Sequence, residues 1–156
     1  MTSPNHYQAV VSSEWVDYNG HMNDAEYARV FSNATDAFIE WIGLDEKTRA
    51  ANCYTIYTLE THLCYKQEMH EGDKLTIGSQ LLDLDDKRIH LFLTMYNEQG
   101  EIAASQEQML MGIDQQKGKG AAFPEAIHNS LLSLFEKDRQ SKIPKNAGRT
   151  IGIRRK

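Results

Sequence analysis

Seven residues near the start of the chain combine the side chains that acid–base or nucleophilic chemistry needs. Asp17 supplies a carboxylate, His21 an imidazole, and Asn19 and Asn23 two amides. A carboxylate can attack a carbonyl carbon or deprotonate water, provided that hydrogen-bond donors face the oxygen on which negative charge develops. The segment after Asn23 reads as a helix, and the first N–H groups of a helix are free to act as such donors. We therefore expect the chemistry in this run, which we call the Asp17–Asn23 motif.

The helix that must position the motif is predicted by its apolar spacing. Apolar side chains recur at three- and four-residue intervals, as on one face of a helix: Tyr27, Val30, Phe31, Ala34, Phe38 and Trp41. Asn23 suits the N-cap, Glu26 completes a capping-box pair with it, and Gly43 suits the stop. We expect a core helix over residues 24–42, roughly 28 Å long at 1.5 Å per residue.

Segments rich in β-branched and aromatic residues surround this helix in the chain. They predict strands over residues 7–12, 54–65, 74–84, 87–96 and 101–113. The short turns between the later strands require antiparallel neighbours. Residues 44–52 read as a loop or a short helical turn, and a short amphipathic helix begins at Pro124. This order predicts an α+β fold, an antiparallel sheet of about five strands curled around one long helix.

Length and composition indicate one globular domain. The chain has 156 residues, of which 40% are hydrophobic and 25% charged. We assign residues 1–140 to a single domain and residues 141–156 to a basic tail that we expect to be mobile. The net charge of −5 argues against nucleic acid as the main partner, and no apolar run approaches the roughly 18 residues of a membrane span.

The expected location is the cytoplasm. Residues 1–7 lack the basic and apolar regions of a signal peptide. Cys53 and Cys64 have neither a metal-site spacing nor a disulfide framework around them, so we expect reduced thiols. A single sheet covers a helix on one side only, and we therefore expect the chain to bury more surface by forming a homodimer or a tetramer.

The motif, followed by Tyr27, resembles the Asp-x-x-Gly-His-(Val/Met)-Asn-(Asn/His)-x-x-Tyr signature of hotdog-fold acyl-CoA thioesterases, in the 4-hydroxybenzoyl-CoA thioesterase-like group. The order of predicted elements resembles that hotdog fold over residues 7–135. Residues 58–65 and 86–92 further resemble the thioesterases of carnitine breakdown, a subgroup associated with betainyl-CoA. The resemblance implies hydrolysis of an acyl-CoA to free acid and CoA, with CoA as part of the substrate and no separate cofactor.

The resemblance also implies roles for the motif residues. Asp17 would be the catalytic carboxylate, either as nucleophile or as general base, and His21 and Asn23 would orient the loop or a water molecule. Asn19, Gly20 and Asp24 would support the loop and the oxyanion, with Gly20 letting the backbone approach the substrate. Asn19 could instead be a turn residue only.

A betainyl group ends in a quaternary ammonium, which aromatic faces and an acid can hold. Trp15 and Tyr18 flank the motif, and Glu60 is the acid we place with them. The alternation from Ile56 to Cys64 suggests that Glu60 lies on one face with His62, so Glu60 either pairs structurally or holds the cation. Glu107 raises the same alternatives.

The chain has no glycine-rich loop for the CoA phosphates. Lys66, Lys87 and Arg88 are the candidate CoA-binding residues, together with the basic tail. We expect no metal site, because His62, His70 and His90 share no short spacing with carboxylates or thiols.

Two other functions use the same fold. In enoyl-CoA hydratases the resembling motif places His five residues after Asp, with Pro between them, whereas His21 is four residues after Asp17 with Gly20 between them. That spacing argues against hydration. The second alternative is a non-catalytic acyl-binding module, against which the intact Asp17 and Asn23 weigh.

Overall fold

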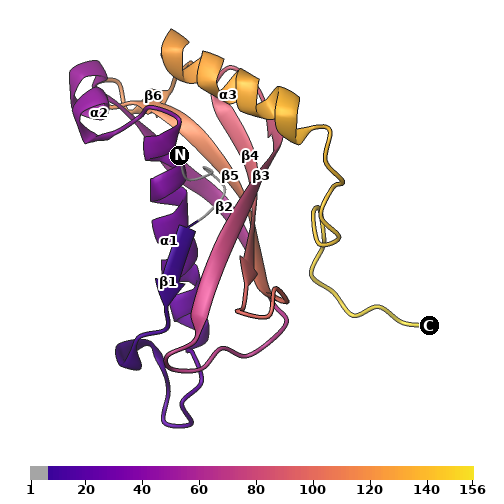
Figure 1. The fold of residues 1–156 in the computed structure, drawn as a ribbon. Coiled ribbons are helices and arrows are strands. Elements are labelled where there is room, and N and C mark those ends of the chain that lie inside the picture. The colour runs from indigo at the N-terminus through magenta and orange to yellow at the C-terminus, as the bar shows by residue number, and fades with distance from the viewer. Residues whose placement is uncertain (1–6) are drawn as a thin grey trace.

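The computed structural model describes residues 7–156, and its helices and strands follow the predicted order (Figure 1). The expectation about a signal peptide concerns the first residues, almost all of which lie outside this range. The elements are β1 (Tyr7–Val10), the 3-10 turn η1 (Ser13–Trp15), α1 (Asp24–Trp41), α2 (Glu46–Asn52), β2 (Tyr54–Tyr65), β3 (Lys74–Leu84), β4 (Arg88–Tyr96), β5 (Ile102–Asp114), β6 (Lys119–Gly120) and α3 (Glu125–Asp138).

The strands form one antiparallel sheet in the order β1-β3-β4-β5-β2, with β6 paired to β5. The sheet curls around α1, as Figure 1 shows. The predicted α+β fold is therefore confirmed. The 3-10 turn η1 and the two-residue strand β6 were not predicted, and α2 is a full helix where a loop or a short turn was expected.

The core lies between α1 and the concave face of the sheet. Alternate residues of β4 fill it and are 0–1% exposed: Ile89, Leu91, Leu93 and Met95. On α1, Tyr27, Phe31 and Phe38 are buried, but Trp41 is 38% exposed, which corrects its predicted place in the core. The buried stripe reaches Ile42 instead, one helical turn after Phe38, because 3.6 residues per turn favour that position.

An extra residue in β2 changes which face its side chains occupy. Thr58 pairs with Leu110 and Glu60 with Met109, so Leu59 forms a bulge. Residues directly opposite one another point to the same face. Thr58 therefore shares the helix side with buried Leu110, while Glu60 points to the outer, convex side. The expectation that Ile56 to Cys64 alternate on one continuous face is wrong at this bulge.

The basic tail crosses the outer face of the sheet (Figure 1). The Gly148 N–H donates to both carboxylate oxygens of Glu107, at 2.8 and 3.1 Å. Nearer its start, the Lys142 carbonyl accepts from Nε2 of Gln80 at 3.3 Å. Under this cover, Phe92 is 3% exposed although it belongs to the outer face. Mobility of the tail stays a prediction.

None of the helices within residues 7–156 is long and apolar enough to span a membrane.

Candidate active site

The Asp17–Asn23 motif is a tight hydrogen-bonded loop. Oδ1 of Asp17 accepts the N–H groups of Asn19 at 2.8 Å and His21 at 3.1 Å. Asp17 also donates its own N–H to the His21 carbonyl and accepts the Gly20 N–H, both at 2.9 Å. Among the described residues Oδ2 of Asp17 has no hydrogen-bond partner, and the residue is exposed. The loop thus fixes the carboxylate and leaves one oxygen for chemistry.

Gly20 has a structural reason to be glycine. Its φ is +78°, a conformation that side-chain-bearing residues rarely adopt. A Cβ at this position would meet no heavy atom of the chain within 4 Å. The positive φ of the turn therefore explains why glycine occupies this position, and a lack of space for a side chain does not.

The start of α1 leaves one backbone N–H group without an acceptor among the described residues. Oδ1 of Asn23 accepts the Ala25 N–H at 3.0 Å, which confirms Asn23 as the N-cap. The predicted capping box is wrong, because the Asn23 N–H donates to the Trp15 carbonyl at 2.8 Å and Glu26 pairs with Arg29 at 2.7 Å. The Asp24 N–H finds no acceptor among residues 7–156.

Tyr27 joins this helix start to the segment before β3. Its hydroxyl donates to the Gln67 carbonyl at 3.3 Å and accepts the Met69 N–H at 3.1 Å. Tyr27 is 4% exposed, which confirms its predicted packing in the core, and burial raises the pKa of its phenol. Its ring meets Tyr65 edge to face at 5.2 Å, and the Tyr65 hydroxyl donates to the Asp24 carbonyl.

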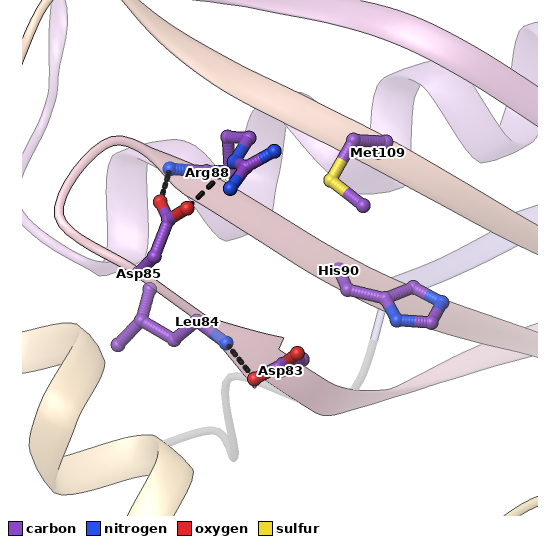
Figure 2. A pocket seen from close by; sticks show the side chains of 6 residues that line it. All are labelled: Asp83, Leu84, Asp85, Arg88, His90 and Met109. Atoms are coloured by element: carbon purple, nitrogen blue, oxygen red, sulfur yellow. Dashed lines mark hydrogen bonds and ion pairs between the residues drawn. The ribbon is translucent and has the colours of Figure 1, made fainter.

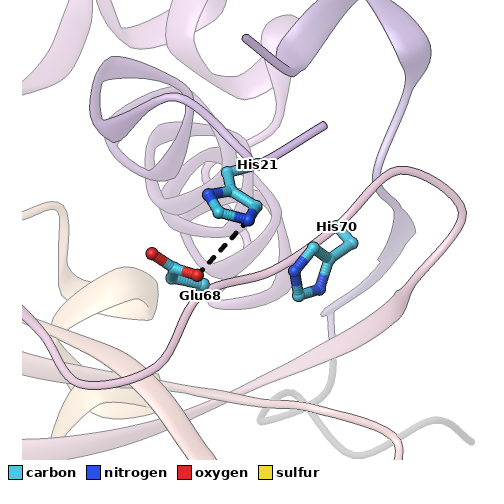
Figure 3. Close-up of side chains that lie close together, drawn as sticks. All are labelled: His21, Glu68 and His70. Carbon is cyan, nitrogen blue, oxygen red and sulfur yellow. Dashed lines mark ion pairs between the residues drawn. The ribbon is translucent and has the colours of Figure 1, made fainter. Parts of the chain in front are cut away.

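His21 lies beside two residues that the sequence did not associate with it. Its Nε2 is 3.4 Å from Oε2 of Glu68, and its ring meets that of His70 edge to face at 4.9 Å (Figure 3). A β-bridge between His21 and His70 brings the two segments together. No local signal predicts this contact, because the bridge joins residues that are far apart in the chain.

The predicted cation cage is not assembled within one chain. Trp15 packs partly against the core, whereas Tyr18 is 97% exposed. Glu60 is on the outer face of the sheet, away from α1, where it lines a cavity of about 220 Å³ whose wall contains none of the motif residues. The lining residues of this cavity are Glu60, Thr61, His62, His90, Glu107, Gln108 and Met109.

The two glutamates differ in their partners. Glu107 is held by His90 Nε2 at 2.6 Å and by the Gly148 N–H, so it has the structural pairing that was one of its alternatives. Glu60 has neither an ion pair nor a side-chain hydrogen bond among the described residues. Glu60 is therefore the freer of the two acids.

The basic candidates for CoA binding lie far apart. Arg88 follows the turn after β3 and pairs with Oδ2 of Asp85 at 2.6 Å (Figure 2). It lies opposite Met111 in the sheet, whereas the Lys66 N–H donates to Ala103. Eight residues of β5 separate these points, about 26 Å at 3.3 Å per residue. Lys66 thus does not share a site with Lys87 and Arg88 in a single chain.

Comparisons with known proteins agree with this geometry. Residues 11–131 match the family described as the thioesterase-like superfamily. The betainyl-CoA thioesterase of Pseudomonas aeruginosa is 39% identical over 148 residues, which cover 94% of this chain and 93% of that protein. The L-carnitine dehydrogenase/betainyl-CoA thioesterase of a Rhizobium species is 39% identical over 147 residues, which cover 93% of this chain and 29% of that longer protein.

Two solved structures extend the similarity to three dimensions. A Staphylococcus aureus protein in complex with CoA has a TM-score of 0.91 and 36% identity, covering 96% of this chain and 94% of that chain. A putative thioesterase from Pseudomonas putida has a TM-score of 0.82 and 34% identity, covering 96% of both chains. The motif at the start of α1, the curled sheet and these similarities lead to one conclusion: the chain belongs to the thioesterase-like superfamily.

Proposed function

We propose that this protein hydrolyses betainyl-CoA to the free acid and CoA. The observation that carries the proposal is the 39% identity to a betainyl-CoA thioesterase along nearly the whole length of both chains. The CoA complex of the Staphylococcus aureus relative supports CoA as the carrier of the acyl group.

The motif geometry supports a route for the reaction. Oδ2 of Asp17 either attacks the thioester carbonyl carbon or removes a proton from the water that attacks it. The Asp24 N–H, at the positive end of α1, donates to the oxygen that becomes negative. When Asp17 acts as the base, it passes the proton taken from water to the sulfur as the C–S bond breaks, and CoA leaves as a thiol. When Asp17 acts as the nucleophile, CoA leaves as a thiolate, and a water molecule then hydrolyses the acyl-enzyme to the free acid, regenerates the Asp17 carboxylate and supplies the proton that the thiolate takes up.

Thiol release from a panel of betainyl-, acetyl-, medium-chain and aromatic CoA thioesters tests the proposal. We expect selective turnover of betainyl-CoA, reduced about 10²- to 10⁴-fold in Asp17→Asn. The amide oxygen of the variant still accepts the two loop N–H groups, so the fold is retained. Asp36→Asn, on the exposed side of α1, is the matched control.

Each other outcome overturns a defined part of the proposal. Turnover of other acyl groups, still abolished by Asp17→Asn, would remove betainyl-CoA as the substrate and keep thioester hydrolysis. If the wild type turned over none of the thioesters, or if Asp17→Asn were as active as the wild type, the proposed enzyme function would be wrong and a non-catalytic acyl-binding module would be favoured.

Recognition of the cation is proposed at Tyr18, whose exposed ring directly follows Asp17. Tyr18→Ala should lower the ratio of betainyl-CoA to acetyl-CoA turnover, and Glu60→Gln in the same assay tests the predicted acid. Leu132→Ala, at an exposed position on α3, is the control. An unchanged ratio in both Tyr18→Ala and Glu60→Gln would exclude these two residues from recognition of the cation.

We also propose a homodimer that forms along β2. This strand lies at the edge of the sheet with β5 as its one neighbour among the described strands, and it exposes Tyr57 (54%) and Leu59 (47%). A lysine on an edge strand opposes pairing between chains. Light scattering should therefore give a dimer for the wild type and a monomer for Tyr57→Lys. Leu132→Lys, on exposed α3, should stay dimeric. A monomeric wild type would overturn the proposal.

The two free thiols, Cys53 and Cys64, support a reducing compartment, and we propose the cytoplasm. Cell fractionation tests this location.

A further inference from the structure

His21 and His70 form a cross-strand pair of a particular kind. The Met22 N–H donates to the Met69 carbonyl at 2.7 Å, and the Glu71 N–H donates to the Gly20 carbonyl at 3.4 Å. These bonds flank His21 and His70, which is the pattern of a non-hydrogen-bonded antiparallel pair. In such a pair the two side chains stand close together on one face. The backbone, and not a chance contact of rotamers, therefore places the two imidazoles side by side.

Glu68 completes the group from the same side. It precedes His70 by two residues, and side chains two residues apart in an extended segment leave on the same face. One ligand atom from each of His21, Glu68 and His70 lies within 4.8 Å of the others (Figure 3). One of these separations, 3.4 Å between His21 Nε2 and Glu68 Oε2, is close to the roughly 3.3 Å between neighbouring ligands of a tetrahedral zinc ion.

Both ends of the segment that carries Glu68 and His70 are held in place. The Tyr27 hydroxyl fixes Gln67 and Met69 to α1. Oδ2 of Asp73 accepts the His70 N–H at 2.8 Å and lies 3.6 Å from Nδ1 of the same ring. A carboxylate beside the second ring nitrogen orients a metal-binding histidine and raises its basicity.

We propose that His21, Glu68 and His70 bind a divalent transition-metal ion, with zinc the best match. Two imidazoles and one carboxylate are a ligand set that zinc takes with a fourth position left to water. We expected no metal site because His62, His70 and His90 share no short spacing with carboxylates or thiols. That expectation left out His21, which the fold places beside His70.

The bound ion would fasten the motif to the segment before β3. His21 donates its N–H to Oδ1 of Asp17, so a metal on its ring holds the residue that orients the candidate catalytic carboxylate. The proposal concerns metal binding by these three side chains and does not depend on which acyl group the protein hydrolyses.

Calorimetric titration of zinc into the full-length, chelator-treated protein, free of any histidine tag, tests the site. We expect one equivalent per chain and a dissociation constant raised at least tenfold in His70→Ala and in Glu68→Gln. Asp73→Asn, which removes the supporting carboxylate, should raise it about tenfold or more. Both Glu68 and His70 are exposed, so these variants should fold, and their metal-free melting temperatures check this.

His128→Ala, a histidine on α3, is the matched control and should bind zinc as the wild type does. Zinc at a hundredfold excess over its dissociation constant should raise the melting temperature of the wild type by on the order of 5 °C, and that of His70→Ala by much less. Unchanged binding in His70→Ala would overturn the proposal.

Cobalt provides a spectroscopic check on the ligands. Nitrogen and oxygen ligation should give visible d–d bands that His70→Ala loses. A sulfur-to-cobalt charge-transfer band would assign the metal to Cys53 or Cys64 and would also overturn the proposal. If neither zinc nor cobalt bound to the wild type, the proposal would likewise be overturned.

Discussion

The hydroxyl of Tyr27 acts as both donor and acceptor in the interior. It accepts the N–H of Met69, whose side chain is 1% exposed, and it donates to the Gln67 carbonyl. A buried N–H group that loses its acceptor costs far more than the net value of the bond. The Tyr27 oxygen therefore helps to hold the segment of Glu68 and His70 against α1, together with the His21–His70 bridge.

Tyr27→Phe should lower the free energy of unfolding by about 1–3 kcal/mol, because it leaves the Met69 N–H without its acceptor. Chemical denaturation measures the change. Tyr18→Phe removes a hydroxyl from a tyrosine that is 97% exposed and is the control. A cost below about 0.5 kcal/mol would mean that water or a shifted backbone replaces the tyrosine oxygen.

At the scale of single residues, the sequence was informative about contacts between residues close together in the chain. Asp17 and Asn23 build a compact loop and a helix cap because the N–H groups that their side chains accept lie at most four positions away. Glu68 could not be placed, because a β-bridge between distant segments brings it to His21. The predicted partners Glu60 and Tyr18 are not brought together, since the bulge at Leu59 turns Glu60 to the outer face.

Among the elements, α1 and the strands were predictable because each has one strong periodic pattern. The apolar alternation of β4 and the helical spacing of α1 match their buried faces, and the bounds of β3 are those predicted. The bulge in β2 was not predictable, because a sequence of β-forming residues is equally compatible with continuous pairing.

Asn23→Ala should destabilise the protein by about 1 kcal/mol, since the Ala25 N–H loses the N-cap oxygen and keeps only Oδ1 of Asp24 as an acceptor. Asn33→Ala, the same substitution at an exposed position inside α1, should be neutral or slightly stabilising because alanine favours helix. Urea denaturation of the two variants separates the loss of the cap from the change in helix propensity that any Asn→Ala substitution brings. Equal effects would show that the cap contributes nothing.

Asp138 gives the contact between α3 and β3 a dependence on pH. It is 6% exposed and its Oδ2 accepts the Leu81 N–H at 2.8 Å. Burial raises the pKa of its carboxyl, so the folded chain holds this proton to higher pH than the unfolded chain. Its contribution to stability therefore falls as pH rises from about 4 through the folded pKa.

Relative to Asp138→Asn, the wild type should lose stability between about pH 4 and neutral pH, because only the wild type must bury a charge. Urea denaturation of both proteins across this range measures the difference between their free energies of unfolding. The contributions of the other titrating groups are the same in both proteins and cancel in this difference. Asp36→Asn, exposed on α1, is the control. A difference that stays constant with pH would contradict the burial argument.

For the molecule as a whole, the tail is bound to the outer face of the sheet by hydrogen bonds at Lys142 and at Gly148. Because its N–H is hydrogen-bonded to Glu107, the backbone amide of Gly148 should have an NMR order parameter of about 0.85, as in rigid backbone. The order parameters of the amides of residues 154–156 should fall below about 0.6. Glu107→Ala should release Gly148, and Glu98→Ala, in an exposed turn, should not. Uniformly low values after residue 141 would show that the Glu107 bond does not persist and that the whole tail is mobile.

The path of the tail also decides where this protein can be attached to something else. The motif precedes α1 on the concave side, while the chain ends beyond the convex side of the sheet (Figure 1). A linker to a bead, a sensor surface or a fused domain at Lys156 would therefore extend away from Asp17. Immobilisation through this end should leave substrate access intact.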